Sequence, residues 1–357
     1  MSGLSVLHVV RRYGPAGGME RYVWELTREL VKLGCSVSVV CEQMVVDKPP
    51  EFVNVHVLGK SIPKPRWLSH LIFSRRLHNW LHQQQNRDLI IHSHERSRNH
   101  HITTFHGPPF ARVLDMPVWK RLSLRALINL WLEKREVCAG QVYTVVPNSR
   151  QTGVLLEYYY PCIGARLSSP VPPGVLPGPA RESHSVPESG GVIGFIGKEW
   201  KRKGLERAIE IVRKLRETKP DLEFWIAGPA PGDIQPLFKE QDEGYKLLGE
   251  VSSAKLYPKF DLLLHPALQE PYGMVITEAM AAAVPVVVSS CSGAADDVGA
   301  SQGRVIDLAA DNKIWIEACK QMLDSNIPLE KYSRSWAEVA RAYASSYQQI
   351  QRNQNLK

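Results

Sequence analysis

The chain has 357 residues, of which 44% are hydrophobic and 22% are charged, and this balance excludes a disordered, collagen-like or coiled-coil protein. Its 44 basic and 36 acidic residues give a formal net charge of +8, which suits an anionic partner such as a nucleotide, a nucleic acid or a phospholipid surface. The length is sufficient for two domains of about 100–200 residues each.

Secretion signals and membrane-spanning segments are not expected. The N-terminal sequence MSGLSVLHVVRRYG lacks the long apolar core and the cleavage site of a signal peptide. No segment approaches the roughly 18 uninterrupted apolar residues that a spanning helix needs. The six cysteines include no CxxC pair, which indicates free or buried thiols in a reducing compartment. We therefore expect a cytoplasmic protein that is at most peripheral on the cytoplasmic face of the inner membrane.

The N-terminal half alternates predicted strands and helices. An apolar strand over residues 4–10 is followed by a glycine-rich turn at 14–18, a helix over 19–33 and a strand over 37–40. Further strands are expected at residues 89–91, 102–105 and 143–146. This alternation predicts a parallel sheet that is covered by helices on both faces.

The C-terminal half resumes the same alternation after a break. Residues 161–187 are rich in proline, glycine and serine and lack periodicity, which indicates a linker between domains. A strand over 192–196, a basic loop and a helix over 205–217 then begin a second unit. They are followed by predicted strands at 224–227, 262–264 and 286–288 and by an amphipathic helix over 332–351.

The densest chemical signal lies between Glu270 and Pro285. Two carboxylates, Glu270 and Glu278, flank a glycine turn that opens a helix, and backbone N–H groups at such a turn form an anion site. A carboxylate can accept two hydrogen bonds from a sugar diol. The alternative is a capped helix with an exposed carboxylate, although the apolar flanks of this helix make an unpartnered carboxylate costly.

This segment resembles the E-x7-E motif of retaining glycosyltransferases with the GT-B fold, family 4. The resemblance continues at residues 248–261, which are similar to the family's LG-x-V-S…L-Y…D run, and at residues 281–287. There, Ala283 stands where glycine is usual, and at 293–296 Asp296 replaces the usual glutamate. The order of these motifs along most of the chain is more specific than any one of them.

The resemblance implies a nucleotide-sugar donor that is held by the C-terminal domain. Glu278 would bind the ribose hydroxyls and Glu270 the donor sugar. Backbone N–H groups of Gly273, Met274 and Val275 would meet the donor sugar or its diphosphate.

The basic loop GKEWKRKG at residues 197–204 is the second candidate. A diphosphate leaving group gains negative charge as the glycosidic bond breaks, and fixed cations can neutralise it. The loop ends in the family's K-G pair, which implies that Arg202 and Lys203 clamp the leaving group without a metal ion or another cofactor. Lys198 stands where the family often has arginine. The alternative is a solvated basic surface loop.

The N-terminal glycine turn offers two interpretations. A dinucleotide fingerprint needs the spacing G-x-G-x-x-G, whereas residues 14–18 read G-x-x-G-G. The turn instead resembles the family's G-G-x-E loop, which implies that Gly17 and Gly18 face the donor phosphates and the acceptor.

Histidines crowd the segment from His92 to His106. Metal binding is an alternative, but an H-x-H pair on a strand supplies two ligands and the spacing shows no third. Residues 88–94 resemble the family strand that ends in H-x-H, and residues 104–107 resemble its T-x-H segment, which implies that His106 lies near the reactive sugar. Asn148 and Ser149 match a phosphate-facing turn of the family.

Two segments, residues 64–80 and 111–137, combine bulky apolar residues with cations. Such helices can lie in an anionic membrane interface or can cover the sheet of the first domain.

Together these observations predict an α/β protein of GT-B fold with two Rossmann-like domains whose parallel sheets face a central cleft. The acceptor-binding domain would span residues 1–170, the linker 171–190 and the nucleotide-sugar-binding domain 191–331, and a helix within 332–357 would pack back on the first domain. The predicted catalytic groups are Arg202, Lys203, Glu270 and His106. No nucleic-acid motif is present, which argues against a nucleic-acid partner.

The resemblance implies retaining transfer of a hexosyl unit from a nucleoside-diphosphate sugar, with UDP as the expected nucleotide, to a glycan or glycolipid acceptor. Assembly of lipopolysaccharide core or another cell-surface polysaccharide is the expected setting. A soluble acceptor is one alternative, and an inactive relative that acts as an assembly partner is another.

Overall fold

The computed structural model describes residues 3–84, 89–181, 185–239, 242–325 and 330–355, and the chain divides into two units. Unit 1 comprises Met1–Gly174 together with Arg334–Lys357, and unit 2 comprises Val175–Ser333. Residues 161–166, within the predicted linker segment, form the 3₁₀ helix η2 (Pro161–Arg166) of unit 1. The predicted linker 171–190 contains the boundary between the units, and its residues 182–184 lie outside the described residues, as does Asp88 of the H-x-H strand motif.

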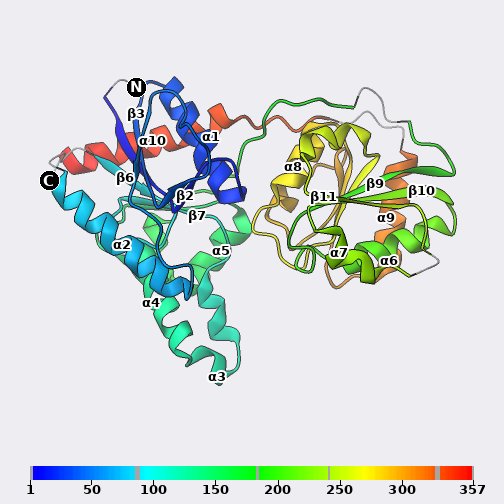
Figure 1. Cartoon of the computed structure of the whole chain (residues 1–357), viewed down its shortest axis with the longest axis horizontal. Coiled ribbons are helices and arrows are strands. Elements are labelled where there is room, and N and C mark those ends of the chain that lie inside the picture. Colours follow the sequence, from blue (N-terminus) through cyan, green and yellow to red (C-terminus); the bar gives the residue numbers. More distant parts are fainter. Residues whose placement is uncertain (1–2, 85–88, 182–184, 240–241, 326–329, 356–357) are drawn as a thin grey trace. The chain divides into compact units, whose positions relative to one another are not determined.

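Unit 1 is built on a six-stranded parallel sheet (Figure 1). Its strands, in spatial order, are β5 (Val53–Val57), β3 (Ser36–Cys41), β1 (Ser5–Val9), β6 (Ile90–Ser93), β7 (Ile102–Phe105) and β8 (Thr144–Pro147). Two short strands, β2 (Arg12–Tyr13) and β4 (Gln43–Met44), form a separate parallel pair. The helices are α1 (Gly18–Lys32), α2 (Arg66–Gln83), α3 (Val118–Arg121), α4 (Leu124–Cys138), α5 (Arg150–Tyr159) and α10 (Trp336–Asn355), with η1 at Phe110–Asp115.

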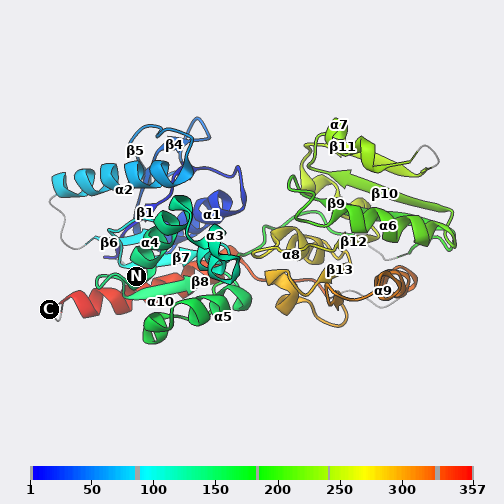
Figure 2. The same ribbon diagram turned by 90° about the horizontal axis from the view of Figure 1, so that it is seen from below.

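Side chains alternate across the sheet of unit 1 and meet different helices on its two faces. Leu7 and Val9 of β1 pack against Phe73 of α2, whereas His92 of β6 bonds through Nδ1 to the hydroxyl of Tyr347 on α10, at 2.6 Å. Figure 2 accordingly shows α2 and α10 on opposite sides of the strands.

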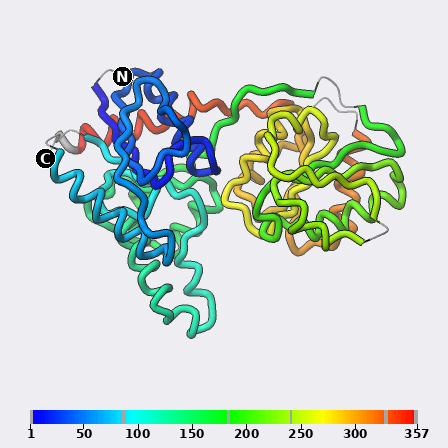
Figure 3. Tube along the Cα trace, viewed as in Figure 1, coloured from blue at the N-terminus to red at the C-terminus, as the bar shows by residue number. Residues whose placement is uncertain are grey.

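The last helix belongs to the same unit as the first. The hydroxyls of Tyr22 on α1 and Tyr343 on α10 lie 3.0 Å apart, and both side chains are buried. In Figure 3 the red C-terminal segment accordingly runs beside the blue N-terminal one. The final helix therefore supplies part of the core of unit 1.

Unit 2 contains a second six-stranded parallel sheet. Its order is β11 (Tyr245–Gly249), β10 (Asp221–Ala227), β9 (Gly190–Ile196), β12 (Leu262–His265), β13 (Val286–Ser289) and β14 (Gly303–Ile306). The helices are α6 (Leu205–Arg216), α7 (Pro231–Ile234), α8 (Met274–Ala281) and α9 (Asn312–Asp324), with 3₁₀ turns η3 (Gln235–Leu237), η4 (Ser253–Lys255), η5 (Tyr257–Lys259) and η6 (Gly293–Asp297).

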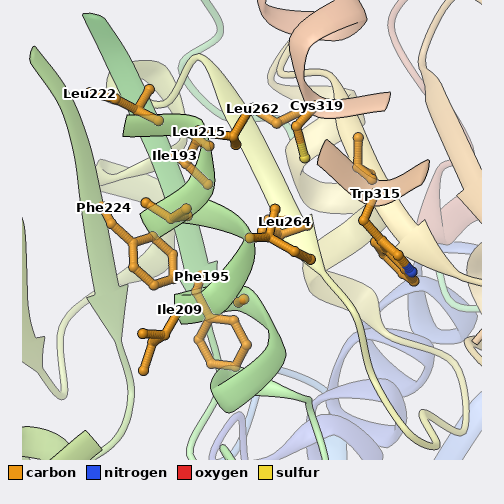
Figure 4. Close-up of a cluster of buried hydrophobic side chains, with 14 of the residues drawn as sticks. Ile193, Phe195, Ile209, Leu215, Leu222, Phe224, Leu262, Leu264, Trp315 and Cys319 are labelled. Carbon is orange, nitrogen blue, oxygen red and sulfur yellow. The ribbon is translucent and has the colours of Figure 1, made fainter. Parts of the chain in front are cut away.

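The core of unit 2 lies on both faces of this sheet. On one face, Phe195 of β9 and Phe224 of β10 pack with α6, and Trp315 and Cys319 come from α9 (Figure 4). On the other face, Ile276 and its neighbours on α8 form a second cluster. Burial of these apolar side chains is the main stabilising contribution, at about 25 cal/mol per Å².

The two sheets share one topology. In each, the third, second, first, fourth, fifth and sixth strands of the sheet lie side by side in that order. The order reverses beside the first strand, and ligands of open parallel sheets bind at the carboxyl ends of the strands at this reversal. The binding crevice is therefore expected between β1 and β6 in unit 1 and between β9 and β12 in unit 2. The prediction of two parallel-sheet α/β domains is confirmed.

Candidate functional site

The two loops that follow β9 and β12 bring the predicted catalytic residues of unit 2 together. Oε2 of Glu270 lies 2.7 Å from Nζ of Lys203 and 3.5 Å from a terminal nitrogen of Arg202. His265, the last residue of β12, places Nε2 3.5 Å from the same oxygen. The side chains of Glu270 and Lys203 are 9% and 12% exposed, so this ion pair is largely screened from solvent.

The surrounding side chains keep Glu270 ionised. Burial opposes ionisation, but His265, Lys203 and Arg202 outweigh it, so the pKa of Glu270 lies well below its usual range. Burial, followed by the charge of Lys203, lowers the pKa of His265, which therefore stays neutral. The site thus holds one carboxylate between two permanent cations at neutral pH.

Two glycines allow the loop after β9 to place Lys203. A Cβ on Gly197 would lie 2.1 Å from Cδ of Lys203, so the lysine stem passes directly over this glycine. Gly204 has φ +77° and precedes α6, and a Cβ there would lie 2.0 Å from the carbonyl oxygen of Pro266. The absence of a side chain at Gly197 lets the Lys203 stem cross its own loop, and at Gly204 it lets the two loops approach each other.

Arg202 links the same two loops. Its Nε and one terminal nitrogen donate to Oε2 of Glu199, at 3.2 and 2.6 Å, and its other terminal nitrogen donates to the carbonyl oxygen of Gln269. Lys198 instead forms an exposed ion pair with Glu250, at 2.6 Å. The structure therefore joins Arg202 and Lys203 to Glu270, while it pairs Lys198 with another acid.

The start of α8 lies beside Glu270. Gly273 has φ +94° and is the N-cap, and a Cβ there would come within 3.0 Å of Cγ of Glu270. Met274 and Val275 are the first two helical residues, and the first backbone N–H groups of a helix have no intrahelical partner. Further along α8, Glu278 is half-buried and accepts a hydrogen bond from the hydroxyl of Tyr257, at 2.7 Å.

The predicted residues of unit 1 lie at the carboxyl ends of three strands. Gly17 is the N-cap of α1, which begins at Gly18, and a Cβ on Gly17 would collide with the carboxylate of Glu20 at 2.4 Å. His106 follows β7, and Asn148 follows the adjacent strand β8, where its N–H donates to the carbonyl of Phe105.

Asn148 and Ser149 also have a structural role. Ser149 is the N-cap of α5 and accepts from the N–H of Thr152, at 3.2 Å. The hydroxyl of Thr152 donates to the side-chain oxygen of Asn148, at 3.1 Å. Both residues are less than 5% exposed, so in this structure they stabilise the start of a helix.

A row of hydrogen-bonded histidines leads from His106 into the core of unit 1. Nε2 of His106 lies 2.8 Å from Nδ1 of His94, whose Nε2 lies 3.1 Å from Nδ1 of His8. Burial lowers the pKa of His8 and of His106 to about 3, so the row is uncharged at neutral pH. His94 therefore holds the ring of His106 in one orientation.

The spacing of the histidines in the sequence does not reveal that a third histidine lies beside His92 and His94. The sequence shows no third ligand beside His92 and His94, yet His8 on the neighbouring strand places a ring nitrogen within 4.8 Å of theirs. In the structure, hydrogen bonds occupy both ring nitrogens of His92 and of His94. A histidine inside an apolar strand looks like a core residue, which is why the sequence does not single out His8 or His265.

A cavity of about 1120 Å³ opens beside this row, entirely within unit 1. His94 and His106 line it together with Glu95, Arg96 and Asn129, which the sequence does not single out. Their contribution depends on contacts between the segment after β6 and α4, which are distant in the sequence, such as the hydrogen bond from Arg96 to Asn129, at 2.7 Å.

The two apolar–cationic segments differ in exposure. The large apolar residues within 64–80 are all buried or half-buried, which indicates that α2 covers the sheet. Residues 111–137 leave a run of large apolar side chains exposed, among them Trp119 at 74% and Leu124 at 68%. Figure 1 shows α3 and the start of α4 projecting from the sheet of unit 1. Within the described ranges, no helix is both long and apolar enough to cross a membrane.

Comparisons with known proteins agree with this geometry. Residues 16–177 match the model of Glycosyltransferase Family 4, and residues 190–325 match that of Glycosyl transferases group 1. Lipopolysaccharide glucosyltransferase WaaG of Escherichia coli (strain K12) is 29% identical over 172 residues, which are 46% of this chain and less than half, 45%, of the relative. A D-inositol 3-phosphate glycosyltransferase of Pseudarthrobacter chlorophenolicus is 25% identical over 94% of this chain and 88% of the relative.

Solved structures show the same fold. The crystal structure of WaaG aligns with a TM-score of 0.75 and 19% identity, over 98% of this chain and 99% of the other. Sucrose-phosphate synthase from Thermosynechococcus elongatus aligns with a TM-score of 0.70 and 15% identity, over 99% and 98% of the two chains. Anabaena HepE in complex with UDP-glucose aligns with a TM-score of 0.60 and 16% identity, over 99% and 98%. The chain therefore belongs to the GT-B glycosyltransferases, with a family 4 region in unit 1 and a group 1 region in unit 2.

Proposed function

We propose that the chain transfers a hexosyl unit from a nucleoside-diphosphate sugar, with UDP as the nucleotide, to a hydroxyl group of a glycan acceptor with retention of configuration. The observation that carries this proposal is the contact of Glu270 with Lys203 and Arg202 at the strand-order reversal of unit 2. Neighbours with the same fold support UDP as the nucleotide, because HepE was crystallised with UDP-glucose.

In the proposed reaction, Lys203 and Arg202 stabilise the departing diphosphate. The bond between the anomeric carbon and the diphosphate oxygen breaks, the acceptor oxygen bonds to the same face of that carbon, and the acceptor proton passes to a diphosphate oxygen. Fixed cations in a site with little solvent stabilise such developing charge without reorganisation. No metal ion is required in this proposal, and activity that persists in a chelator such as EDTA would support it.

The two glutamates have separate roles in this proposal. Glu270 holds hydroxyl groups of the donor sugar and Glu278 those of the ribose, while the N–H groups of Met274 and Val275 meet the diphosphate or sugar. A glycosidase needs two carboxyl groups that converge on one bond. Here Glu270 is engaged by cations and Glu278 by Tyr257, which favours binding roles.

The proposed acceptor is a lipid-linked glycan, such as a lipopolysaccharide core, at the cytoplasmic membrane face. The exposed apolar residues of α3 and α4 stand among the cations Lys120, Arg121 and Arg125, a combination that suits an anionic interface. The WaaG relative is a lipopolysaccharide glucosyltransferase by name. A soluble acceptor is the alternative, and binding to lipid vesicles distinguishes the two.

Variants at the two ends of the proposed donor site test the reaction. Lys203→Ala should lower kcat at least tenfold, because a charged hydrogen bond to the leaving group contributes about 1.5–3 kcal/mol. Glu278→Ala should mainly weaken donor binding. The measurements are UDP release with a panel of UDP-sugars, and thermal stabilisation by UDP, which binds only the folded form.

Lys214→Ala on α6 is the matched control, because Lys214 forms an exposed pair with Glu217 and should leave both readouts unchanged. Full activity in both Lys203→Ala and Glu278→Ala would discard the proposal. Stabilisation by UDP with no turnover on any donor would instead indicate an inactive relative that acts as an assembly partner.

A further inference from the structure

The cavity of unit 1 has an excess of positive charge. Lys64, Arg66, Arg96 and Arg125 line it, from the loop before α2, from α2, from the segment after β6 and from α4. A concave site lined by one sign of charge concentrates ligands of the opposite sign.

The acids of the same cavity do not cancel this charge. Burial raises the pKa of Glu95 to about 7 and that of Glu136 to about 8. Both carboxyl groups are therefore partly or mostly protonated near neutral pH. They can hydrogen-bond to hydroxyl groups, but they contribute less than one full negative charge each.

Three of the four cations are not engaged with acids. Arg96 donates to Asn129 and to Glu133, at 2.7 and 3.1 Å, and its guanidinium stacks over the ring of Phe110. Among the described residues, no acidic side chain pairs with Lys64, Arg66 or Arg125, which are all exposed where they line the cavity. These three side chains are free to contact a ligand.

The positive field extends into the cavity. His70 lines its wall, and its pKa falls to about 3, first through burial and then through the charges of Arg11, Arg96 and Arg66. Trp67 and Phe110 add aromatic surface to the same wall, as is common in pockets that take small organic ligands.

We propose that this cavity binds an acceptor saccharide that carries a phosphate or carboxylate group, with Arg66 and Arg125 contacting the anion. This proposal rests on the glycosyl transfer proposed above and names the chemical class of its acceptor. A guanidinium forms two parallel hydrogen bonds with such an anion, and His106, which lines the same cavity, is left to meet the sugar. The anion can belong to a soluble sugar phosphate or to a phosphorylated lipid-linked glycan.

Isothermal titration calorimetry with glucose 6-phosphate, inorganic phosphate and glucose tests this inference. We expect glucose 6-phosphate to bind more tightly than phosphate, and glucose to bind at least tenfold more weakly than its phosphate. The double variant Arg66→Gln/Arg125→Gln should weaken glucose 6-phosphate binding at least tenfold. The control Arg75→Gln/Lys134→Gln removes two exposed charges from the same helices, α2 and α4, outside the cavity, and should change binding less than twofold.

Two outcomes would overturn the inference. Glucose that binds as tightly as its phosphate would remove the need for an anion, and an equal loss in the control variant would indicate general surface charge.

Phosphatidylglycerol vesicles distinguish the sources of the anion. The protein can bind these vesicles and yet fail to bind glucose 6-phosphate. In that case, loss of vesicle binding in the Arg66/Arg125 variant supports a lipid-linked source, whereas vesicle binding that persists in the variant contradicts the proposal. Stabilisation by UDP is measured in parallel on the same proteins. A wild-type protein that UDP stabilises but that binds neither glucose 6-phosphate nor, through Arg66 and Arg125, the vesicles would refute this inference alone. A wild-type protein that UDP does not stabilise would refute the proposed donor site.

Discussion

Ala283 has a backbone φ of +56°, in the left-handed region that glycine adopts freely. Its N–H bonds to the carbonyl of Met280 just after α8 ends, so it occupies the position where many helices have glycine. A Cβ in this conformation costs about 1–2 kcal/mol. This strain explains why the family pattern has glycine at this position. Ala283 lies just after the end of α8, the helix that carries Glu278.

We predict that Ala283→Gly raises the free energy of unfolding by up to about 1 kcal/mol, because relief of strain exceeds the added entropy of the unfolded chain. Denaturant unfolding measures the change. The neighbouring Ala282→Gly, at φ −85°, is the control and should destabilise the protein. Equal destabilisation in both variants would contradict the argument.

At the same scale, the candidate site shows what the sequence can and cannot predict. Glu270, Lys203 and Arg202 are recognisable because motifs surround them, but Lys203 and Glu270 are 67 residues apart. Their direct contact depends on the loops after β9 and β12 meeting at the strand-order reversal, which only the topology establishes. His265 has no local signal, because it ends an apolar strand like any core residue.

Among elements, the inner strands and the outer strand β8 are predictable from the sequence, whereas the other three outer strands are not. The inner strands β1, β9 and β12 are short apolar runs that are almost wholly buried, as expected for parallel sheets. The outer strands β5, β11 and β14 are only partly buried, and their mixed sequences are typical of loops as well. The pairing of these three strands with their neighbours determines them, so periodicity alone does not reveal them, whereas the outer strand β8 is a buried apolar run.

The helices α3 and α4 carry the membrane prediction. Trp119 and Leu124 are largely exposed, and Arg121 stands beside them. We predict that vesicles with anionic lipid sediment the protein and that Trp119→Ala/Arg121→Gln reduces the bound fraction several-fold, because it removes apolar insertion and charge attraction together.

The control for this experiment is Ile314→Ala/Lys313→Gln on α9, which removes the same two kinds of exposed side chain from unit 2. It should leave the bound fraction unchanged. Absence of sedimentation by anionic vesicles would favour a soluble acceptor and would leave the donor-site proposal in place.

For the whole molecule, buried titratable groups make stability depend on pH. Eight histidines of unit 1 have lowered pKa values, with burial as the main cause: His8, His70, His78, His92, His94, His100, His101 and His106. Below about pH 6.5 the unfolded chain binds protons at these residues that the folded chain does not, so stability falls as pH falls. Glu95 and Glu136 act in the opposite direction, because their raised pKa values let the folded chain hold protons up to about pH 7–8.

We therefore predict that thermal stability is highest near about pH 6.5 and decreases toward both pH 5 and pH 8. Each histidine that is not offset contributes a slope of up to about 1.4 kcal/mol per pH unit on the acid side. Scanning calorimetry between pH 5 and pH 8 measures this, and His8→Leu should flatten the acid side. A midpoint that rises steadily toward acid would show that the histidines are protonated in the fold.

The return of α10 to unit 1 has a consequence for how the protein is made. Tyr343 and Tyr347 complete the interior of the first unit, yet they leave the ribosome only after the whole of unit 2. Unit 1 therefore cannot complete its core until α10 has been synthesised, whereas unit 2 can fold before that point. Removal of the last turns of α10 would therefore destabilise unit 1, although most of unit 1 precedes unit 2 in the sequence.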